Sequence, residues 1–143
     1  MCRLKGFSLL EVLISLIVLS IGLLGIAGLQ AASLRFNHAG ELRSIAMFQA
    51  ENMLDRMRAN KDGVDAGNYD NASGIPANPG CTSTCTSAQV AQQDISEWNT
   101  ENAAILPIGQ GTVTRVSNIV TVTIFWDNNR DGSLTSIQMS SEL

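Results

Sequence analysis

The chain has 143 residues, which is enough for one small domain and one long helix but not for two sizeable cores. Its formal net charge is −4, with 9 Lys and Arg against 13 Asp and Glu, and this acidic balance argues against broad nucleic-acid binding. Aromatic residues are few, at 5%, and small polar residues dominate the second half, which is typical of an exported domain with a modest core.

The first predicted element is an apolar helix near the N-terminus. No charged residue occurs from Val12 to Leu34, and its most apolar part, Val12–Leu29, would span roughly 27 Å, close to the thickness of the hydrocarbon core of a bilayer. Arg3 and Lys5 precede it, so the positive-inside rule places the N-terminus in the cytoplasm and the rest of the chain across the inner membrane. A cleavable secretory signal is the alternative, which the long apolar run and the lack of an A-x-A site after it disfavour.

One acid, Glu11, stands at the head of this apolar run. A carboxylate costs about 2.5–3.5 kcal/mol at the centre of a bilayer and less near the interface, so an acid in such a segment is usually functional. An interfacial acid without a role is the alternative. The stretch around it, KGFSLLEV, resembles the class III signal of type IV pilins and pseudopilins, because a basic segment, Gly, Phe, a small polar residue, two Leu and Glu precede some twenty apolar residues.

This resemblance implies processing and assembly. In that family, a prepilin peptidase on the cytoplasmic face cuts after the glycine and methylates the new N-terminal residue, so that cleavage here falls between Gly6 and Phe7 and Phe7 becomes N-methylated. In a stack of parallel helices, Glu11 of an incoming subunit would neutralise the Phe7 amine of its neighbour. A mispaired subunit leaves two uncompensated charges in apolar surroundings, so the pair would set the axial register.

Three glycines, Gly22, Gly25 and Gly28, lie in the apolar half of the helix. Small residues allow close packing of membrane helices. Glycine also weakens a helix by about 1 kcal/mol relative to alanine, which would favour local melting. Many pilins carry a helix-weakening proline in this region and this chain does not, so either the glycines replace it or the helix stays intact.

The helix is predicted to continue to about Asn60 and to be amphipathic in its second half. Its core face repeats with the helical period, through Leu42, Ile45, Ala46, Ala50, Met53 and Met57. Ser44, Glu51, Asp55 and Arg58 lie on the opposite face. The last two are spaced for an i,i+3 ion pair. The Lys-Asp-Gly stretch at Lys61–Gly63 is predicted to end the helix.

Residues 63–86 are predicted to form an irregular loop held by two cysteines. Cys81 and Cys85 form an even pair in an exported domain, which predicts a disulfide. Closing so small a loop contributes about 2 kcal/mol on the chain-entropy model. A metal site is the weaker hypothesis, because His38 is the only histidine and zinc sites need four ligands.

The remaining elements follow in chain order. Thr86 and Gln89 form a capping box that begins a short amphipathic helix, which ends at Leu106 before Pro107. Its buried face is predicted to contain Ala91, Ile95, Trp98, Asn102 and Ile105, with Trp98 as a core anchor. Three strands are expected at GTVTRV, NIVTVTIFW and SLTSIQM, the second with the alternation of a half-buried strand. The predicted fold is therefore α+β and pilin-like, a long N-terminal helix packed on a small antiparallel sheet.

Several stretches together narrow the resemblance: the N-terminal 25 residues from Gly6, the early cysteine pair, Asp94-x-x-x-Trp98, LPIGQG and VTVTIFWDNN. They look like the PilV, or type IV pilus modification protein, family of minor pilins. The resemblance implies a prepilin with a leader at 1–6, a transmembrane assembly helix at 7–34 and a periplasmic head at 35–143. Such proteins help to start pilus assembly and end in the filament or its tip.

The partners implied are prepilin peptidase, other minor pilins, the major pilin, the inner-membrane assembly platform and membrane lipid. A minor pseudopilin of a type II secretion system, which shares leader and fold, is the alternative. A module for DNA uptake or adhesion would need a basic or aromatic patch, for which Arg115 and Arg130 are too few. No nucleic acid, cofactor or metal is expected.

One turn is a candidate calcium loop. Asp127, Asn129, Asp131 and Gly132 match positions 1, 3, 5 and 6 of an EF-hand, but Gln138 stands at the twelfth position, where the bidentate Glu belongs. A hairpin turn is therefore the favoured interpretation, with weak calcium binding as the alternative. Because His38 is the only histidine and the acids are scattered, no catalytic group can be assembled, and an enzyme is not expected.

Overall fold

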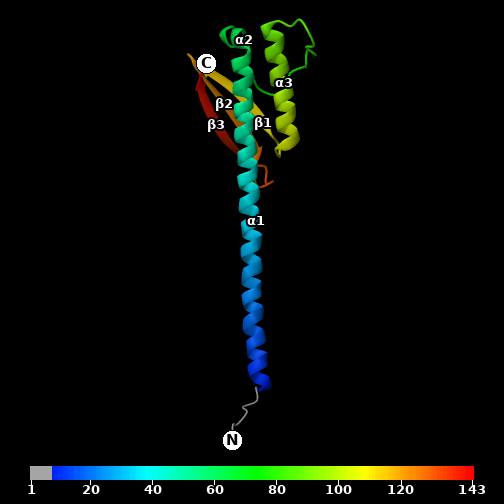
Figure 1. Ribbon diagram of the computed structural model, residues 1–143, viewed down its shortest axis with the longest axis vertical. Coiled ribbons are helices and arrows are strands. Elements are labelled where there is room, and N and C mark those ends of the chain that lie inside the picture. The colour runs from blue at the N-terminus through cyan, green and yellow to red at the C-terminus, as the bar shows by residue number, and fades with distance from the viewer. Residues whose placement is uncertain (1–7) are drawn as a thin grey trace. The chain divides into compact units, whose positions relative to one another are not determined.

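The computed structural model describes residues 8–143 (Figure 1). Two compact units divide the chain, Met1–Ala39 and Gly40–Leu143. The helices are α1 (Leu9–Ala59), which belongs to both units, α2 (Lys61–Asp65) and α3 (Ser87–Ile105). The strands are β1 (Gln110–Val116), β2 (Ile119–Asp127) and β3 (Leu134–Glu142).

The first unit consists of the N-terminal part of α1. The helix runs without interruption through Gly22, Gly25 and Gly28, and a Cβ added at any of these would meet nothing within 4 Å. The predicted alternative of local melting is therefore wrong for this structure, and the helix stays intact. The hydroxyls of Ser15 and Ser20 donate to the backbone oxygens one turn before them, at 2.7 and 2.8 Å, so neither polar group needs water.

The second unit begins with the rest of α1, whose buried side follows the predicted stripe. The buried residues of α1 are Leu42, Ala46, Gln49, Ala50, Met53, Leu54 and Met57. Ile45 is only partly buried against this core. Asp55 and Arg58 form the predicted i,i+3 ion pair at 2.6 Å on the exposed side.

The prediction for the end of α1 needs a correction. The helix ends at Ala59, but Lys61–Asp65 forms the short helix α2 where a loop was expected. The backbone N–H groups of Gly63 and Val64 donate to the Asn60 oxygen at 3.0 and 3.2 Å, which starts a new turn at once. Val64 is buried in the core, so tertiary packing outweighs the low helix propensity of the Asp-Gly pair.

Helix α3 begins as predicted. The Thr86 hydroxyl accepts the Gln89 backbone N–H at 3.3 Å and the Gln89 side chain accepts the Thr86 backbone N–H at 3.0 Å, so the capping box is confirmed. Trp98 is fully buried, which confirms it as a core anchor. Ile105 was predicted on the buried face and is 42% exposed, because the helix ends there and the chain turns away at Leu106.

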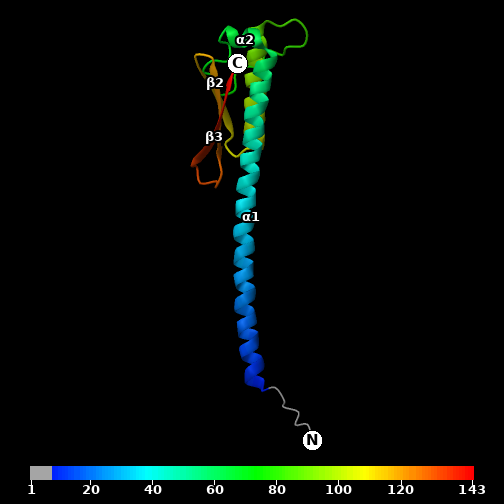
Figure 2. The same cartoon turned by 60° about the vertical axis from the view of Figure 1, so that its left-hand side comes forward.

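The sheet is antiparallel with the order β1-β2-β3. In β2 the residues Val120, Val122, Ile124 and Trp126 are buried, as the alternation predicted. Figures 1 and 2 show that, within the second unit, α3 lies beside α1 in one layer and the sheet forms the other. The apolar helix and the small antiparallel sheet confirm the predicted α+β, pilin-like architecture.

Candidate functional site

The start of α1 is built around Ser8 and Glu11. The Ser8 hydroxyl accepts the backbone N–H of Glu11 at 3.2 Å, and the Ser8 backbone oxygen accepts the N–H groups of Glu11 and Val12 at 3.1 and 3.3 Å. Ser8 therefore acts as the N-cap and Glu11 lies at the third helical position, as the Ser-Leu-Leu-Glu spacing of a capping box allows. A carboxylate in the first turn also interacts favourably with the helix dipole. Glu11 thus has a local stabilising role that sequence reasoning missed.

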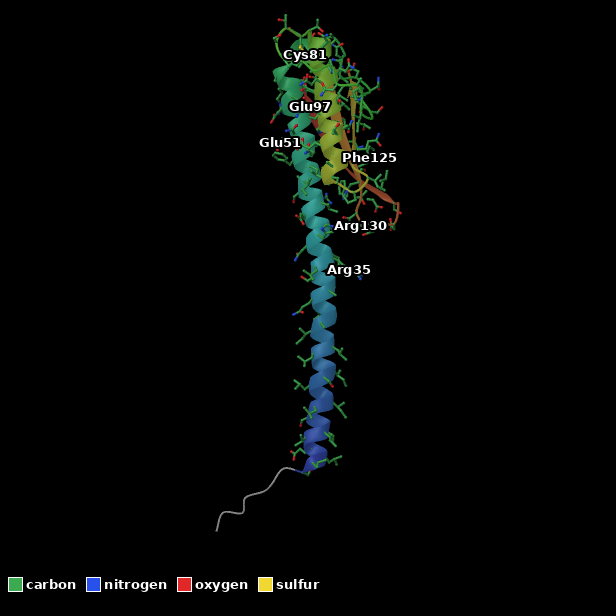
Figure 3. All side chains as sticks on the ribbon, turned by 90° about the vertical axis from the view of Figure 1, so that its right-hand side faces the viewer. Arg35, Glu51, Cys81, Glu97, Phe125 and Arg130 are labelled. Atoms are coloured by element: carbon green, nitrogen blue, oxygen red, sulfur yellow. A yellow bond between two sulfur atoms is a disulfide. The ribbon has the colours of Figure 1, made fainter. Side chains whose placement is uncertain are left out.

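The apolar surface behind Glu11 has no partner within the described chain. Every residue from 8 to 38 is exposed, including long aliphatic side chains such as Leu10, Ile17 and Leu24. Soluble monomers rarely expose an apolar surface of this extent. By length and composition, α1 is the one described helix that could cross a membrane. Figure 3 shows its side chains projecting from the helix on all sides in this part.

Gly6 and Phe7, which carry the predicted cleavage, lie outside the described residues. The predicted pairing of Glu11 with the Phe7 amine of another subunit involves a second chain and stays a prediction. The carboxylate of Glu11 is exposed on the first turn of α1. It is therefore accessible to a cation on a neighbouring molecule, as that pairing requires.

In the head, a polar cluster joins α1 to α3. Arg56 of α1 donates from Nη1 to Asp94 at 3.2 Å and to Glu97 at 3.1 Å, and from Nε to Asn52 at 2.9 Å. Burial works to lower the pKa of Arg56, but the hydrogen bonds with Glu97 and Asp94 outweigh it and raise that pKa. This cluster has no signature in the sequence, because Arg56 is separated from Asp94 by 38 positions and from Glu97 by 41, and no local spacing connects them.

Tyr69 extends the cluster into the loop after α2. Its hydroxyl donates to Asp94 at 2.6 Å and accepts from the Asn60 amide at 3.0 Å, and the side chain is fully buried. Burial, and then the hydrogen bond to Asp94, raise the pKa of Tyr69 well above its ordinary value. Asn60 also donates to the Ser87 backbone oxygen at 2.9 Å. The end of α1, the loop and the start of α3 are therefore held by one network.

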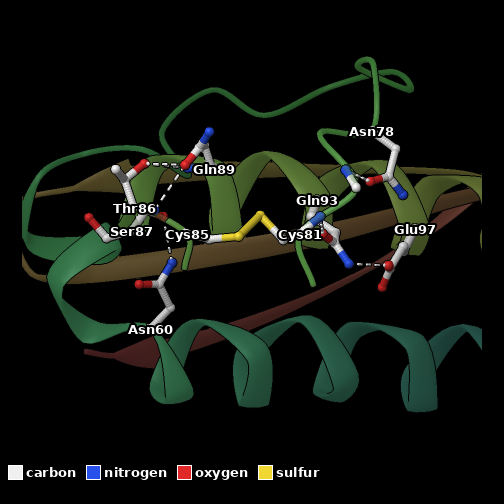
Figure 4. Close-up of a disulfide and its surroundings, with 10 residues drawn as sticks. Asn60, Asn78, Cys81, Cys85, Thr86, Ser87, Gln89, Gln93 and Glu97 are labelled. Carbon is white, nitrogen blue, oxygen red and sulfur yellow. Dashed lines mark hydrogen bonds between the residues drawn. A yellow bond between two sulfur atoms is a disulfide. The ribbon is translucent and has the colours of Figure 1, made fainter. Parts of the chain in front are cut away.

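The loop that contains Cys81 and Cys85 lies against α3 (Figure 4). Cys81 and Cys85 are joined as a disulfide with their Cα atoms 5.9 Å apart, a separation within the usual range. The Cys81 backbone N–H donates to the Gln93 side chain at 2.7 Å, and Gln93 donates to Glu97 at 2.7 Å. The predicted pairing thus fits the geometry, and a chain of hydrogen bonds connects the loop to the cluster around Arg56.

A second buried group that sequence reasoning missed surrounds Asn99. Its amide donates to the backbone oxygens of Gly74 and Gly111 at 2.7 and 3.1 Å and accepts the Gly111 N–H at 2.7 Å. A Cβ at Gly111 would collide with the Trp98 ring, and a Cβ at Gly109 would collide with the Asn102 backbone oxygen. The glycines of LPIGQG are therefore required by close packing of β1 on α3.

The two basic residues considered for a binding patch differ in their contacts. Arg115 donates from Nε and Nη2 to Asp70 at 3.2 and 2.9 Å and from Nη1 to the Val64 backbone oxygen at 2.7 Å. It is therefore occupied in holding the loop after α2. Arg130 lies exposed in the turn between β2 and β3, with a φ of 57° (Figure 3).

The candidate calcium loop is the hairpin turn between β2 and β3. The Asp127 carboxylate accepts the backbone N–H groups of Asn129, Asp131 and Gly132 at 3.1, 3.3 and 2.8 Å, led by the Gly132 contact, and these bonds lower its pKa. The hydrogen bonds within the turn therefore account for an acidic residue at position 127. Within residues 8–143, no group of three or more His, Cys, Asp or Glu side chains is placed to hold a metal ion.

One comparison with known proteins is informative. Residues 1–27 match the family model described as the prokaryotic N-terminal methylation motif. No curated protein and no solved structure matches the chain. The motif supports a type IV pilin-like protein that is a substrate of prepilin peptidase, and the proteins that carry it are structural rather than catalytic. Together, the motif and the apolar helix suggest anchoring in a membrane.

Proposed function

We propose that this protein is a minor type IV prepilin of the PilV kind. It is inserted in the inner membrane with its N-terminus in the cytoplasm and its head in the periplasm, cleaved between Gly6 and Phe7, and N-methylated at Phe7. The observation that carries this proposal is the methylation motif at residues 1–27, which runs directly into a helix whose apolar surface is exposed from residue 8 to residue 38. A leader alone would also suit a short anchor, but this helix continues into the core of the head.

Glu11 has two roles in the proposed function. Within one chain it stabilises the first turn of α1, and between chains it binds the methylated Phe7 amine of a neighbouring subunit. An ion pair inside an apolar bundle gives little net stability, but a subunit docked out of register leaves both charges unpaired. The pair therefore selects the axial position at which each subunit joins.

Two features of the head, its disulfide and its polar cluster, support this proposal. The disulfide at Cys81–Cys85 suits the oxidising periplasm. The cluster around Arg56 and the buried Tyr69 join the C-terminal part of α1 to α3 and to the loop after α2. Such a head joins the filament together with other minor pilins and the major pilin through the assembly platform, and it contributes to the start of assembly.

The test is a deletion of the gene in its own bacterium, complemented with the wild type, Glu11→Ala or Ser15→Ala. We expect the deletion to reduce surface pili, the wild type and Ser15→Ala to restore them, and Glu11→Ala to accumulate in the membrane without restoring them. Ser15→Ala is the matched control, because it removes a polar group from the adjacent turn of the same helix. Normal pili with a loss of secreted exoproteins would contradict the proposal and favour a minor pseudopilin of a type II secretion system.

A further inference from the structure

The two edge strands of the sheet, β1 and β3, differ in how far the rest of the chain covers them. At the β1 edge, the Val113 backbone N–H donates to the Ala72 oxygen at 3.0 Å, and Asn99 bonds both backbone groups of Gly111. The guanidinium of Arg115 is bound to the loop after α2. The β1 edge is therefore partly covered, because both backbone groups of Gly111 and the N–H of Val113 have partners in the same chain.

The orientation of the β3 edge follows from the same hydrogen bond. Because the Val113 N–H points away from β2, its cross-strand partner Val122 directs its own backbone groups toward β3, where it pairs with Met139. The register of β2 with β3 is unbroken, so alternate residues of β3 point the other way. The outward-pointing backbone groups are thus those of Ser136, Gln138 and Ser140, together with Leu134 and Glu142 at the ends of the strand.

Three of these residues, Ser136, Gln138 and Ser140, have outward groups without a partner among the described residues, whereas the Glu142 backbone oxygen accepts the Ser141 hydroxyl at 3.3 Å. Neither the N–H nor the C=O of Ser136, Gln138 or Ser140 takes part in a hydrogen bond within residues 8–143. In Figures 1 and 2, β3 is the outermost strand of the sheet, with β2 on its other side. The side chains of the same three residues are exposed. β3 therefore presents a row of unpaired donors and acceptors.

Apart from Glu142 at its end, the sequence of β3 carries none of the usual protections of an edge strand. Natural edges are blunted by lysine, proline, inward charges or a bulge. Residues 134–141, LTSIQMSS, contain no charge and no proline, and the one-to-one register excludes a bulge. A long, neutral and regular edge is a template for another strand. Beside it, Ile137 and Met139 are only partly buried on the core side of the sheet.

We propose that β3 is a docking edge for an extended segment of a partner protein, which adds a fourth strand to the sheet. The free backbone groups select an extended peptide, since only such a chain offers alternating donors and acceptors at the same spacing. Ile137 and Met139 select apolar residues at alternate positions of that segment, because its side chains on the core side lie next to them. The partner segment is thus a strand with alternating apolar and small polar residues.

A second copy of this chain is the other occupant considered. A two-fold axis could pair the β3 strands of two copies in one continuous sheet, where the two strands would run antiparallel. The same rotation would reverse the direction of the second head, including residues 40–59 of its α1. The exclusion of this arrangement rests on the proposed function, in which all copies are anchored in one membrane by the same end of α1 and residues 40–59 of that helix run in the same direction in each copy. The partner at the β3 edge is therefore a different protein.

The test uses the full chain in detergent micelles and a fluorescein-labelled peptide of the length of β3, in which valine and threonine alternate. Binding is followed by fluorescence anisotropy, with empty micelles as the blank. We expect saturable binding, and a peptide N-methylated at alternate residues, which cannot donate along one edge, to bind at least about tenfold more weakly. This comparison leaves the protein unchanged, so it does not depend on the folding of any variant.

Two variants locate the site. Gln138→Pro removes an N–H that the fold does not use, which edge strands tolerate, and we expect it to weaken peptide binding about tenfold. Gln138→Thr changes the side chain but keeps the N–H, and we expect it to bind as the wild type does. Equal binding of both peptides, no saturable binding, or equal binding by the proline and threonine variants would overturn the proposal. Dimerisation of the full chain that Gln138→Pro abolishes would also overturn it, in favour of a second copy.

Discussion

Gly111 lies against the ring of Trp98 with no room for a side chain between them. The contact joins β1 to α3, and Trp98 in turn donates its indole N–H to the Gln49 backbone oxygen of α1 at 2.8 Å. Both layers of the head therefore meet at one aromatic residue. The absence of a Cβ at position 111 is what allows the sheet to approach this closely.

The first prediction concerns this contact. Gly111→Ala forces either the Trp98 ring or β1 to move, and we expect it to lower the free energy of unfolding of the head by about 1–3 kcal/mol, as overpacked cores do. The measurement is a denaturant titration followed by tryptophan fluorescence. Gly40→Ala is the control, because a Cβ there meets nothing within 4 Å and alanine favours the helix. Equal stability of the Gly111→Ala variant and the wild type would show that the ring moves without cost.

A second prediction concerns acid stability through Glu97. The hydrogen bond from Arg56, and then that from Gln93, lower the pKa of Glu97 from its ordinary value of 4.5. A carboxyl whose pKa is lower in the folded than in the unfolded state contributes stability above the unfolded pKa, and this is lost as the pH falls through the folded value. The free energy of unfolding should therefore decrease below about pH 4.5, with a modest share from Glu97 because its side chain is 41% exposed.

The variant Glu97→Gln tests this share directly. We expect the acid dependence of its unfolding free energy to be shallower than that of the wild type. Glu51→Gln is the matched control, since it removes the same charge from an exposed position on α1 outside the cluster (Figure 3). Identical acid profiles for the two variants would contradict a role for the Arg56 pair.

A third prediction concerns Tyr69, the only tyrosine of the chain. Burial and the hydrogen bond to Asp94 raise its pKa, so the folded state holds the proton more tightly than the unfolded state. Its contribution to stability is complete below the ordinary pKa of 10.0 and is lost as the pH rises toward the higher folded value. In an alkaline absorbance titration we expect tyrosinate to form only when the head unfolds, whereas the denatured chain titrates near the ordinary value. Titration of the folded protein near that value would contradict the buried hydrogen bond.

A fourth prediction concerns the three cysteines. If Cys81 and Cys85 are paired, alkylation without reduction labels only Cys2 in the unprocessed precursor and nothing in a chain that has lost residues 1–6. After reduction, the same two forms should take three and two labels. Two labels on the unreduced processed chain would show that the pair is open. Cys81→Ser should cost about 2 kcal/mol of unfolding free energy, the loop-closure value.

Much of this architecture could be predicted from the sequence, because its signals are local. The capping box at Thr86, the alternation of β2 and the stripe of α1 are periodic patterns that need no knowledge of the rest of the chain. The Lys61–Asp65 helix could not be predicted, since the burial of Val64 depends on tertiary packing. Gln49 was missed for the same reason, because a polar side chain on a core face gives no apolar signal.

The residues of the candidate site likewise differ in whether a local sequence pattern predicts them. Glu11 and the flanking residues form a contiguous stretch, so a local motif predicts their roles in processing and assembly, and these roles stay predictions. Ser8 as the helix cap was not recognised, although the Ser-Leu-Leu-Glu spacing carries that signal. The cluster of Arg56, Asp94 and Tyr69 depends on contacts between distant segments, and a single sequence contains no pattern that brings them together.

The central claim is that the chain is processed as a prepilin between Gly6 and Phe7. Its most direct test is the intact mass and N-terminal residue of the membrane-extracted protein from cells with and without their prepilin peptidase. The account predicts a terminus of N-methylated Phe7 when the peptidase is present and the uncleaved leader when it is absent. An intact Met1 in both strains, or cleavage near Ala32, would contradict the claim and leave Glu11 with its local role in the helix alone.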